Sequence, residues 1–243
     1  MIITSFNILA DTFVENNKTF LDRWYPTLNY DELMMKTRFN TLIKYIKGDV
    51  VMLQEVTPYI RRKLYNIFKL NYIIMPLSCH KTNKNITGNL TILKRNNIFQ
   101  SPTQKTIYIG NNGIGVTETE FINIYNIHLD CDSSVKRNNE LTKIISTFDK
   151  NKKIIIGGDF NSDENELHNL LKQEDFKINC PVIKGTYLCE TPMIDYIYVY
   201  GFLNPITTIH NTITNTNSNC YKNTIKKYGS DHHPITVRVK NTI

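Results

Sequence analysis

The sequence predicts an α/β fold of the α+β type, with β-sheets packed on each other and helices outside. Short apolar runs rich in β-branched residues recur along the chain, and each run has the length of a strand. Apolar residues with helical spacing lie between some of these runs, without strict alternation of helix and strand. Packed sheets with outer helices fit that order of elements. No internal repeat and no Pro-, Gly- and Ser-rich linker divides the chain, so we expect one domain over residues 1–243.

Nine of the runs predict β-strands. The run Phe121–Ile127 alternates in part between apolar and polar residues, as a half-buried strand does. The nine runs, in chain order, are Ile2–Ile8, Val50–Leu53, Tyr72–Met75, Leu90–Leu93, Thr106–Ile109, Phe121–Ile127, Ile154–Ile156, Ile194–Tyr200 and Ile235–Val239.

Four helices are expected from apolar stripes. The first runs from Met35 to Ile46, with Gly48 placed to end it. Thr57 and Pro58 are typical of an N-cap and a first helical residue, so a second helix begins there. The other two are marked by Leu141, Ile144, Ile145 and Phe148, and by Leu167, Leu170 and Leu171. Two polar stretches, Cys79–Asn89 and Asn211–Gly229, are expected to be surface loops.

Composition indicates which partners and which cellular location to expect. Lys and Arg outnumber Asp and Glu by 29 to 22, which favours polyanionic partners but is also common in proteins that are basic for solubility alone. The five cysteines form no C-x-x-C pair, which argues against a disulfide framework and a zinc knuckle. We find no signal peptide and no run of roughly 20 apolar residues. An intracellular location is therefore expected, with the cytoplasm favoured and the nucleus as the alternative, and without a membrane partner.

Several polar residues lie at predicted strand ends, where a rigid scaffold presents functional groups. Asn7 lies in the first strand and Glu55 ends the second, while Asp159 and Asn161 follow Ile154–Ile156. Each also has a purely structural interpretation. Asn7 would be a buried amide that needs hydrogen-bond partners, Glu55 a solvated carboxylate, and Asp159 and Asn161 part of a turn.

Asp195 and the histidines carry a stronger signal. Asp195 lies inside an apolar strand, and a buried carboxylate must be paired or neutralised, for which a cationic histidine is suited. His232 and His233 precede the final predicted strand, and His128 ends another. A zinc site is an alternative, but adjacent histidines in an extended chain point to opposite faces and no second Cys/His cluster completes it.

Taken in order, these motifs resemble those of the endonuclease/exonuclease/phosphatase superfamily. They are Asn-Ile-Leu, Leu-Gln-Glu-Val, His-Leu, Gly-Asp-Phe-Asn, Ile-Asp-Tyr-Ile and Ser-Asp-His-x-Pro, and they run from Asn7 to Pro234. The resemblance implies a four-layer α/β/β/α sandwich of two mixed β-sheets, with an active site at one edge of the sheets. It also implies a metal-dependent phosphodiesterase that hydrolyses nucleic acid.

The resemblance also assigns roles. It implies a Mg²⁺ ion, replaceable by Mn²⁺, with Glu55 as principal ligand aided by Asn7 and Asp231. Arg137, which follows the His-Leu motif, would bind substrate. The general base is either Asp159 or His232. The catalytic set is His128, Asp159, Asn161, Asp195 and His232.

The segments Ser5–Asp11, Gly158–Ser162 and Ile194–Ile197 are most similar to deadenylases and their nocturnin-like and 2′-phosphodiesterase relatives. This favours a 3′ exoribonuclease acting on single-stranded RNA, with DNA as the alternative nucleic acid. Tyrosyl-DNA phosphodiesterases share the His-Leu and Ser-Asp-His motifs but usually lack Phe160. A hydrolase of lipid or inositol phosphates and an inactive nucleic-acid-binding module are further alternatives, and the sequence identifies no protein partner.

A geometric prediction follows from these roles. One phosphate must touch residues spread over the whole chain, so all the named side chains except Arg137 should converge at strand ends in one cleft. Asp195 should hydrogen-bond one ring nitrogen of His232, and Glu55 should lie close to Asp231. His233 should point away, and crowding of carboxylates without a cation should raise their pKa values.

Overall fold

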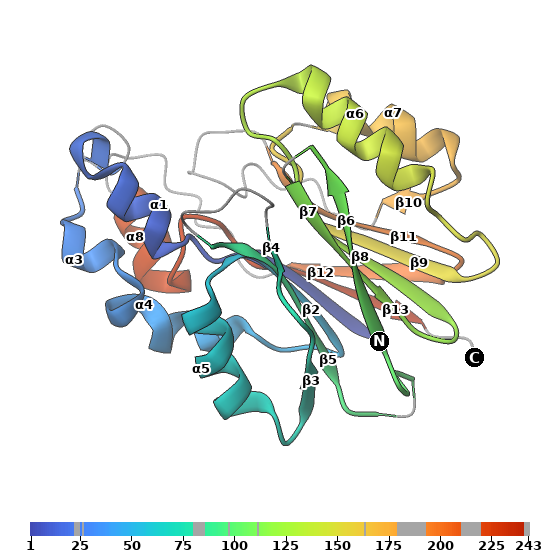
Figure 1. The fold of residues 1–243 in the computed structure, drawn as a ribbon, viewed down its shortest axis with the longest axis horizontal. Helices are drawn as coiled ribbons and strands as arrows, with labels where there is room; N and C mark the ends of the chain where they lie inside the picture. Colours follow the sequence, from blue (N-terminus) through green and yellow to red (C-terminus); the bar gives the residue numbers. More distant parts are fainter. Residues whose placement is uncertain are drawn as a thin grey trace.

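The computed structural model describes the chain apart from residues 22–24, 26, 80–85, 97, 111, 163, 179–192, 210–219 and 241–243. Two mixed β-sheets pack face to face in it (Figure 1). The first sheet has the strand order β12-β13-β1-β2-β5-β3, with β4 paired to β5. It contains β1 (Ile2–Asn7), β2 (Val50–Val56), β3 (Tyr72–Ile74), β4 (Ser78–Cys79), β5 (Gly88–Lys94), β12 (Leu203–Ile209) and β13 (Ile235–Lys240).

The second sheet has the order β10-β11-β9-β8-β7-β6. Both sheets are mixed because each contains one parallel pair, β1 with β2 and β8 with β9, among antiparallel neighbours. The strands of this sheet are β6 (Thr103–Ile109), β7 (Asn112–Glu118), β8 (Ile122–His128), β9 (Lys153–Asp159), β10 (Lys177–Ile178) and β11 (Asp195–Tyr200).

Helices lie on the outer faces of both sheets. α6 (Ser134–Ile145) and α7 (Glu164–Gln173) cover the second sheet, at the top of Figure 1. The first sheet is flanked by α1 (Asp11–Asn16), the 3₁₀ turn η1 (Lys18–Phe20), α3 (Tyr30–Leu33), α4 (Met35–Leu42) with the 3₁₀ turn η2 (Ile43–Tyr45), α5 (Pro58–Phe68) and α8 (Cys220–Tyr228). The expected α/β sandwich of two mixed sheets with outer helices is confirmed.

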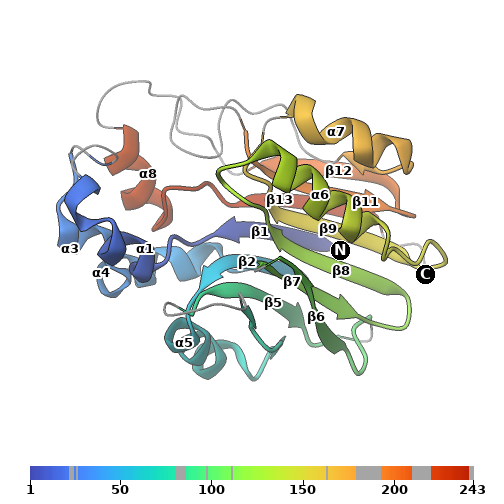
Figure 2. The same cartoon turned by 45° about the horizontal axis from the view of Figure 1, so that its top comes forward.

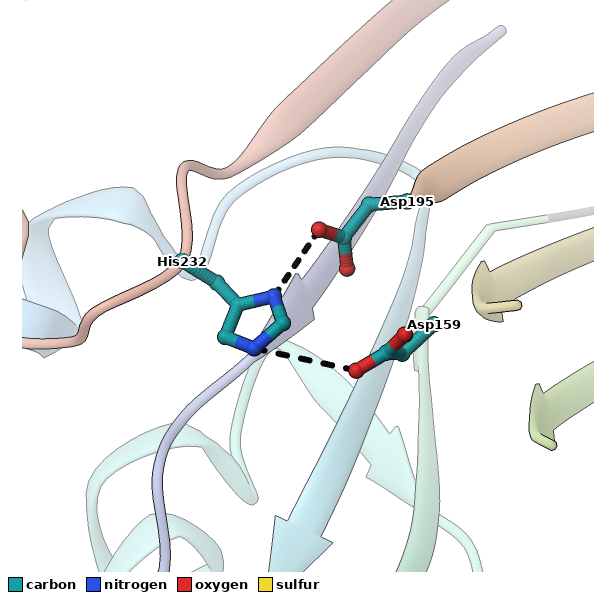
Figure 3. A group of neighbouring side chains, drawn as sticks. All are labelled: Asp159, Asp195 and His232. Carbon is teal, nitrogen blue, oxygen red and sulfur yellow. Dashed lines mark hydrogen bonds and ion pairs between the residues drawn. The ribbon is translucent and has the colours of Figure 1, made fainter. Parts of the chain in front are cut away.

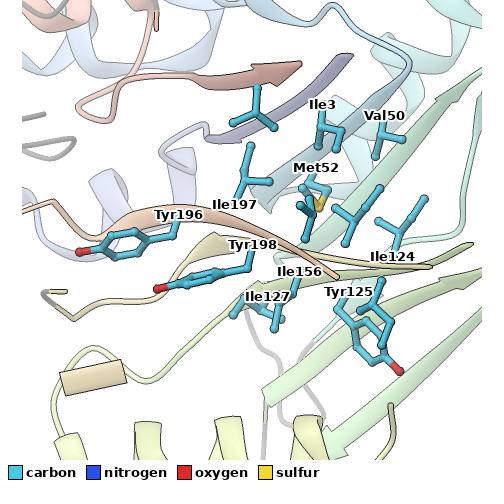
Figure 4. Packing of buried hydrophobic residues seen from close by; sticks show 14 of the residues in the cluster. Ile3, Val50, Met52, Ile124, Tyr125, Ile127, Ile156, Tyr196, Ile197 and Tyr198 are labelled. Atoms are coloured by element: carbon cyan, nitrogen blue, oxygen red, sulfur yellow. The ribbon is translucent and has the colours of Figure 1, made fainter. Parts of the chain in front are cut away.

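Alternation along the strands builds two of the core layers. In β2, Val50 and Met52 face the second sheet, whereas Val51 and Leu53 face the helices, since successive side chains point to opposite faces. Figure 4 shows Val50 and Met52 among residues of the second sheet such as Ile156. On the helix side, Leu64 and other apolar residues of α4 and α5 fill the layer.

All nine predicted strands are present, and the four predicted helices are found. Thr57 caps α5 through a bond from the Ile60 amide to its hydroxyl, and Pro58 is the first helical residue as expected. No helix in the described ranges combines the length and the apolar character that a membrane span requires. Cys79 and Cys131 carry free thiols.

The expected loop Asn211–Gly229 is wrong over its second half, because α8 spans Cys220–Tyr228. This helix was missed since its composition is polar, yet Ile225 and Tyr228 are buried and α8 packs on α4. Residues 211–219 lie outside the described ranges. Within the other expected loop, Cys79 ends β4 and Gly88 begins β5, while residues 80–85 are also outside the described ranges.

Candidate active site

The ends of six segments meet at one edge of the two sheets. The parallel register of β1 with β2 places Asn7 opposite Gln54, next to Glu55. In the second sheet, Asp159 at the end of β9 is in register with His128 on one side and with Asp195 on the other. The segment before β13 brings the remaining motif to the same edge. Strand pairing therefore gathers side chains that are far apart in sequence.

His232 lies between two carboxylates, as Figure 3 shows. Its Nδ1 is 2.8 Å from Oδ2 of Asp195, and its Nε2 is 3.7 Å from Oδ2 of Asp159. All three residues are buried. The Asp195 carboxylate accepts a hydrogen bond from Nδ1–H, and Nε2 is the nitrogen turned toward Asp159. The predicted hydrogen bond between Asp195 and His232 is confirmed.

Burial and neighbouring charges shift the pKa of His232 in opposite directions. Burial opposes the imidazolium, but the carboxylates of Asp195 and Asp159 outweigh it and raise the pKa of His232 well above 6.5. Burial is also the main cause of the raised pKa of Asp159, and the nearby charge of Asp195 adds to it. The raised carboxyl pKa expected for crowded carboxylates is therefore found at Asp159.

Asn7 connects the two sheets at this edge. Its Nδ2 donates to Oε1 of Glu55 and to Oδ2 of Asp159, each at 3.0 Å, while its Oδ1 accepts from the amide of Leu9. His128 approaches the same Asp159 oxygen, with Nε2 3.7 Å from Oδ2. Oδ2 of Asp159 thus faces an amide and two imidazoles, from β1, β8 and the segment before β13.

Glu55 is held in an unusual backbone conformation. Its φ is 60°, and the pairing of β2 with β5 is irregular between Leu53 and Val56. A bulge of this kind redirects a side chain, here so that Oε2 accepts from the amide of Ala10 at 2.8 Å. Strained residues of this kind concentrate at functional sites.

The Gly-Asp-Phe-Asn motif also has a steric explanation. A Cβ on Gly158 would lie 1.9 Å from the carbonyl oxygen of Ile127 in the neighbouring strand, and its φ is 152°. Only glycine fits there without pushing Asp159 out of position. Asn161 adopts φ 49°, its amide nitrogen donates to Asp159, and its Nδ2 donates to the carbonyl of Leu129 at 2.9 Å.

Asp231 is buried beside this group, and sequence reasoning missed its main partner. The hydroxyl of Tyr25 donates to its Oδ2 at 2.8 Å. Burial raises the pKa of Asp231, and the charge of Glu55 acts in the same direction, whereas His232 opposes it. Asp231 therefore lies within the electrostatic reach of Glu55. Nothing in the sequence around Tyr25 signals this contact.

Arg38 is a second residue that sequence reasoning missed. It is fully buried, and its guanidinium donates to four carbonyl oxygens: Leu33 at 2.5 Å, Ile8 at 2.6 Å, Gly229 at 2.8 Å, and Leu9. Ile8 directly follows Asn7, and Gly229 lies two residues before Asp231. Arg38 thus ties together the two segments that carry these side chains. The signal for it was a cation on the buried stripe of a helix, beside Met35 and Phe39.

Two further assignments can be compared with the structure. His233 packs on the ring of Tyr228 at 4.9 Å between centroids, in the helix layer, so it does turn from Asp159 as expected. Arg137 is not brought into the group around Asp159. Its Nη1 donates to the carbonyls of Asp130 and Cys131, so it shapes the loop after β8.

The donor set fits a divalent cation. The candidate ligand atoms of Asp159, Asp195 and His232 lie within 4.8 Å of one another. The hydrogen bond to Asp195 and the raised pKa of His232 favour a protonated ring, which cannot bind a metal, so carboxylate oxygens are the ligands that fit best. Glu55 and Asp231 add carboxylate oxygens nearby, and oxygen donors suit Mg²⁺ or Mn²⁺. His232 and the buried Arg38 do not balance four neighbouring carboxyl groups, so a cation would relieve the raised pKa values.

Two packed sheets with a buried Asp-His-Asp group at one edge define a class of hydrolase. A model of the endonuclease/exonuclease/phosphatase family matches residues 4–232, so the chain belongs to this family. Among curated protein sequences none matches the chain.

Solved structures with the same fold cover nearly all of the chain. ANGEL2, a 2′,3′-cyclic phosphatase, superposes with a TM-score of 0.73 at 15% identity, covering 98% of this chain and 94% of that one. A family member from Bacteroides vulgatus gives 0.67 at 15% identity and 98% coverage of each chain. Truncated TDP2 from Caenorhabditis elegans gives 0.65 at 14% identity, covering 99% of this chain and 97% of that one.

Proposed function

We propose that this chain is a divalent-metal-dependent phosphodiesterase that hydrolyses nucleic acid, with single-stranded RNA carrying a free 3′ end as its preferred substrate. The observation that carries the proposal is the buried group of Asp195, His232 and Asp159. Such a group places a proton acceptor and a proton donor side by side at the edge where an anionic substrate can approach.

Each residue of the group has a distinct role in the proposal. Asp195 holds the ring of His232 and stabilises its charged form, so Nε2 can donate a hydrogen bond to a phosphate oxygen. Asp159 orients or deprotonates the attacking water, and His232 is the alternative general base. His128 donates to a second phosphate oxygen, and Asn161 positions the water or the phosphate.

Glu55 is the principal metal ligand in the proposal, with Asn7 and Asp231 assisting. When bound, a divalent ion neutralises charge on the phosphate and polarises the bond to be broken. Glu55 and Asn7 already share a hydrogen bond, and Ala10 fixes the second Glu55 oxygen. These contacts hold the Glu55 carboxylate in one position, which supports its role as the principal ligand.

The similar structures support testing other phosphoester ends. ANGEL2 is a 2′,3′-cyclic phosphatase, and it is similar to this chain over 98% of the length. A 2′,3′-cyclic phosphate at an RNA end is thus a second candidate substrate. DNA ends, a 5′-tyrosyl-DNA end included, are the alternative suggested by the shared Ser-Asp-His motif.

An activity panel tests the proposal. The protein is incubated with Mg²⁺ and single-stranded RNA, RNA with a 2′,3′-cyclic end, single-stranded DNA, a 5′-tyrosyl-DNA end, and an inositol phosphate. We expect RNA to be shortened from its 3′ end, and Asp195→Asn to slow this by on the order of 10²–10⁴-fold at saturating substrate, with a smaller change in KM. Cleavage of the tyrosyl end alone would move the assignment to the DNA-end alternative. Hydrolysis of the inositol phosphate alone would reject nucleic acid as substrate.

A further inference from the structure

The positive charge of the chain is concentrated in one stretch. From Val56 to Thr117 there are nine Lys and Arg residues and no Asp or Glu. The rest of the chain contains 20 Lys and Arg against 22 Asp and Glu, so it is slightly acidic. The whole net charge of +7 therefore comes from this stretch. If the excess of Lys and Arg served only to keep the protein soluble, these residues would be spread evenly along the chain and not concentrated in one stretch.

The stretch forms one side of the molecule. It contains α5, the neighbouring β3, β4 and β5, and the second sheet's edge strand β6 with most of β7. Figure 2 shows α5, β5, β6 and β7 along the lower side. α5 begins at Pro58, three residues after Glu55, so one end of this basic side starts beside the candidate active site.

The outer face of α5 alternates cations with aromatic rings. Tyr59, Arg62, Tyr65 and Lys69 are all exposed, and they lie on one face of the helix, which we call the α5 basic face. Tyr59 is 59% exposed and Tyr65 47%. The helix is about 16 Å long at 1.5 Å per residue. Arg95 continues the face, since its Nε donates to the carbonyl of Lys69.

Carboxylates do not neutralise these cations. Among the described residues of the stretch, only Lys105 pairs with a carboxylate, that of Glu118. Lys63 of α5 and Lys69, which caps its C-terminal end, instead lie near aromatic rings, Lys63 4.9 Å from the ring centre of Tyr59 and Lys69 5.7 Å from that of Tyr65. Exposed cations and rings in alternation are the features with which proteins hold a phosphate backbone and stack its bases.

We infer that the α5 basic face binds the part of a single-stranded nucleic acid that extends beyond the candidate active site. The inference rests on the proposed function and deepens it, because it gives the substrate a path along the protein surface. Charge complementarity selects a polyanion, and the two exposed tyrosines select one with unstacked bases over a duplex. An anionic membrane surface would use the cations but gives the rings of Tyr59 and Tyr65 no bases to stack on.

Binding without hydrolysis tests the inference. A labelled RNA of about 12 nucleotides, and a DNA of the same sequence, are titrated with full-length protein in EDTA and followed by fluorescence anisotropy. Arg62→Glu/Lys69→Glu should weaken binding at least about tenfold and reduce the slope of log K against log salt by about 1.4, since each lost phosphate contact contributes about 0.7 for single strands. Tyr59→Ala/Tyr65→Ala should weaken binding about tenfold or more through lost stacking.

Matched controls separate this face from general charge. Lys143→Glu/Lys172→Glu makes the same change in net charge on exposed positions of α6 and α7, and it should alter affinity less than about twofold. Phe121→Ala, on an exposed ring elsewhere, is the control for the tyrosines. Circular dichroism checks that each variant is folded. Equal weakening by the test and control pairs would overturn the inference.

Two more measurements distinguish the remaining outcomes. Hydrolysis of bis(p-nitrophenyl) phosphate, which is too small to reach along α5, should be unchanged in all these variants. If the wild-type protein hydrolyses no phosphodiester, the proposed function fails, whereas the binding data still decide the inference. Vesicles containing phosphatidylserine are the second probe. Loss of vesicle binding in Arg62→Glu/Lys69→Glu with unchanged oligonucleotide binding would assign the face to a membrane and overturn the inference.

Discussion

Asn7 illustrates how much one side chain contributes at this site. Its amide has two hydrogens, and each is donated to a different carboxylate, one in the same sheet and one in the other. An aspartate at this position would place three carboxylates together, and an apolar residue would leave both acceptors without this donor. The position of Glu55 relative to Asp159 is therefore set by a neutral group.

Glu55→Gln should separate metal binding from folding. The substitution keeps the shape of the side chain and removes one charge, so the metal-free protein should stay folded, although Gln can accept only one of the two bonds that Glu55 accepts from Asn7 and Ala10. Metal affinity should fall at least about 10–100-fold, and hydrolysis at limiting Mg²⁺ should fall with it. Isothermal titration with Mg²⁺ and initial rates measure the two effects. Glu15→Gln, on an exposed glutamate of α1, is the control. Native rates in limiting Mg²⁺ would show that Glu55 is not a ligand.

The alkylation rate of the Cys131 thiol should depend on pH. Burial of its sulfur, and then the charge of Asp132, raise the pKa of this thiol to about 11. Only the thiolate reacts with iodoacetamide, so the rate should rise about tenfold for each pH unit between 8 and 10. Asp132→Asn should lower the pKa and speed the reaction at pH 8. Peptide mapping by mass spectrometry identifies the modified cysteine, and a rate that levels off below pH 9 would contradict this prediction.

At the scale of elements, Arg38 joins α4 to two connecting segments. Arg38→Met would leave four carbonyl groups without their donor in a buried setting, which should lower the free energy of unfolding by roughly 3–5 kcal/mol. Arg38→Lys keeps the charge but cannot donate to all four carbonyls, so we expect a folded protein with a reduced kcat. Urea unfolding and steady-state rates measure these effects.

Arg61→Lys provides the matched comparison for Arg38. Arg61 lies on α5 and donates one bond, from Nε to the carbonyl of Met75. This substitution should cost less than about 1 kcal/mol and leave kcat unchanged. If Arg38→Lys behaved in the same way as Arg61→Lys, the carbonyl contacts of Arg38 would not be what positions Asn7 and Asp231.

Elements could be predicted where local pattern and packing agree. Most of the nine strands are buried, and their apolar runs reflect that burial, whereas the edge strands β3 and β6 are only partly buried or exposed. β7 was missed because Gly113 and Gly115 interrupt its pattern. A Cβ on Gly113 would lie 2.2 Å from the carbonyl oxygen of Cys79, so the glycine reflects a close approach of β4 that only the fold reveals.

Some contacts of the candidate site could also be predicted from the sequence, and others could not. The pairing of Asp195 with a histidine could be predicted, because a carboxylate in an apolar strand requires a cation. The contacts of Tyr25 with Asp231 and of Arg38 with Gly229 could not, since they join residues 206 and 191 positions apart and nothing in the sequence around Tyr25 or Gly229 signals them. The role of Arg137 in substrate binding was predicted by resemblance alone and stays a prediction, while its Nη1 contacts the loop after β8.

At the scale of the whole molecule, a metal ion held by the buried carboxylates would couple its binding to stability. A ligand that binds only the folded state stabilises it by about 2.7 kcal/mol at a concentration of 100 times Kd. For a chain of this size that corresponds to a rise in Tm of about 5–10 °C. Calorimetry with Mg²⁺ or Mn²⁺ against EDTA should show this rise, and K⁺ at equal ionic strength should not. A Tm that is indifferent to divalent ions would argue against a metal site.

The order in which the ribosome makes this chain has a consequence for its chemistry. β1 pairs with β13, and Asn7 needs the segment of Ser230, whose hydroxyl donates to its carbonyl at 2.7 Å. At about 5–20 residues per second, synthesis from Asn7 to His232 takes on the order of 10–45 s. Throughout that interval β1 lacks its neighbour β13 in the first sheet, and the imidazole between Asp195 and Asp159 has not yet been made. Products of interrupted translation that stop before His232 therefore lack one member of the buried group of Asp195, His232 and Asp159.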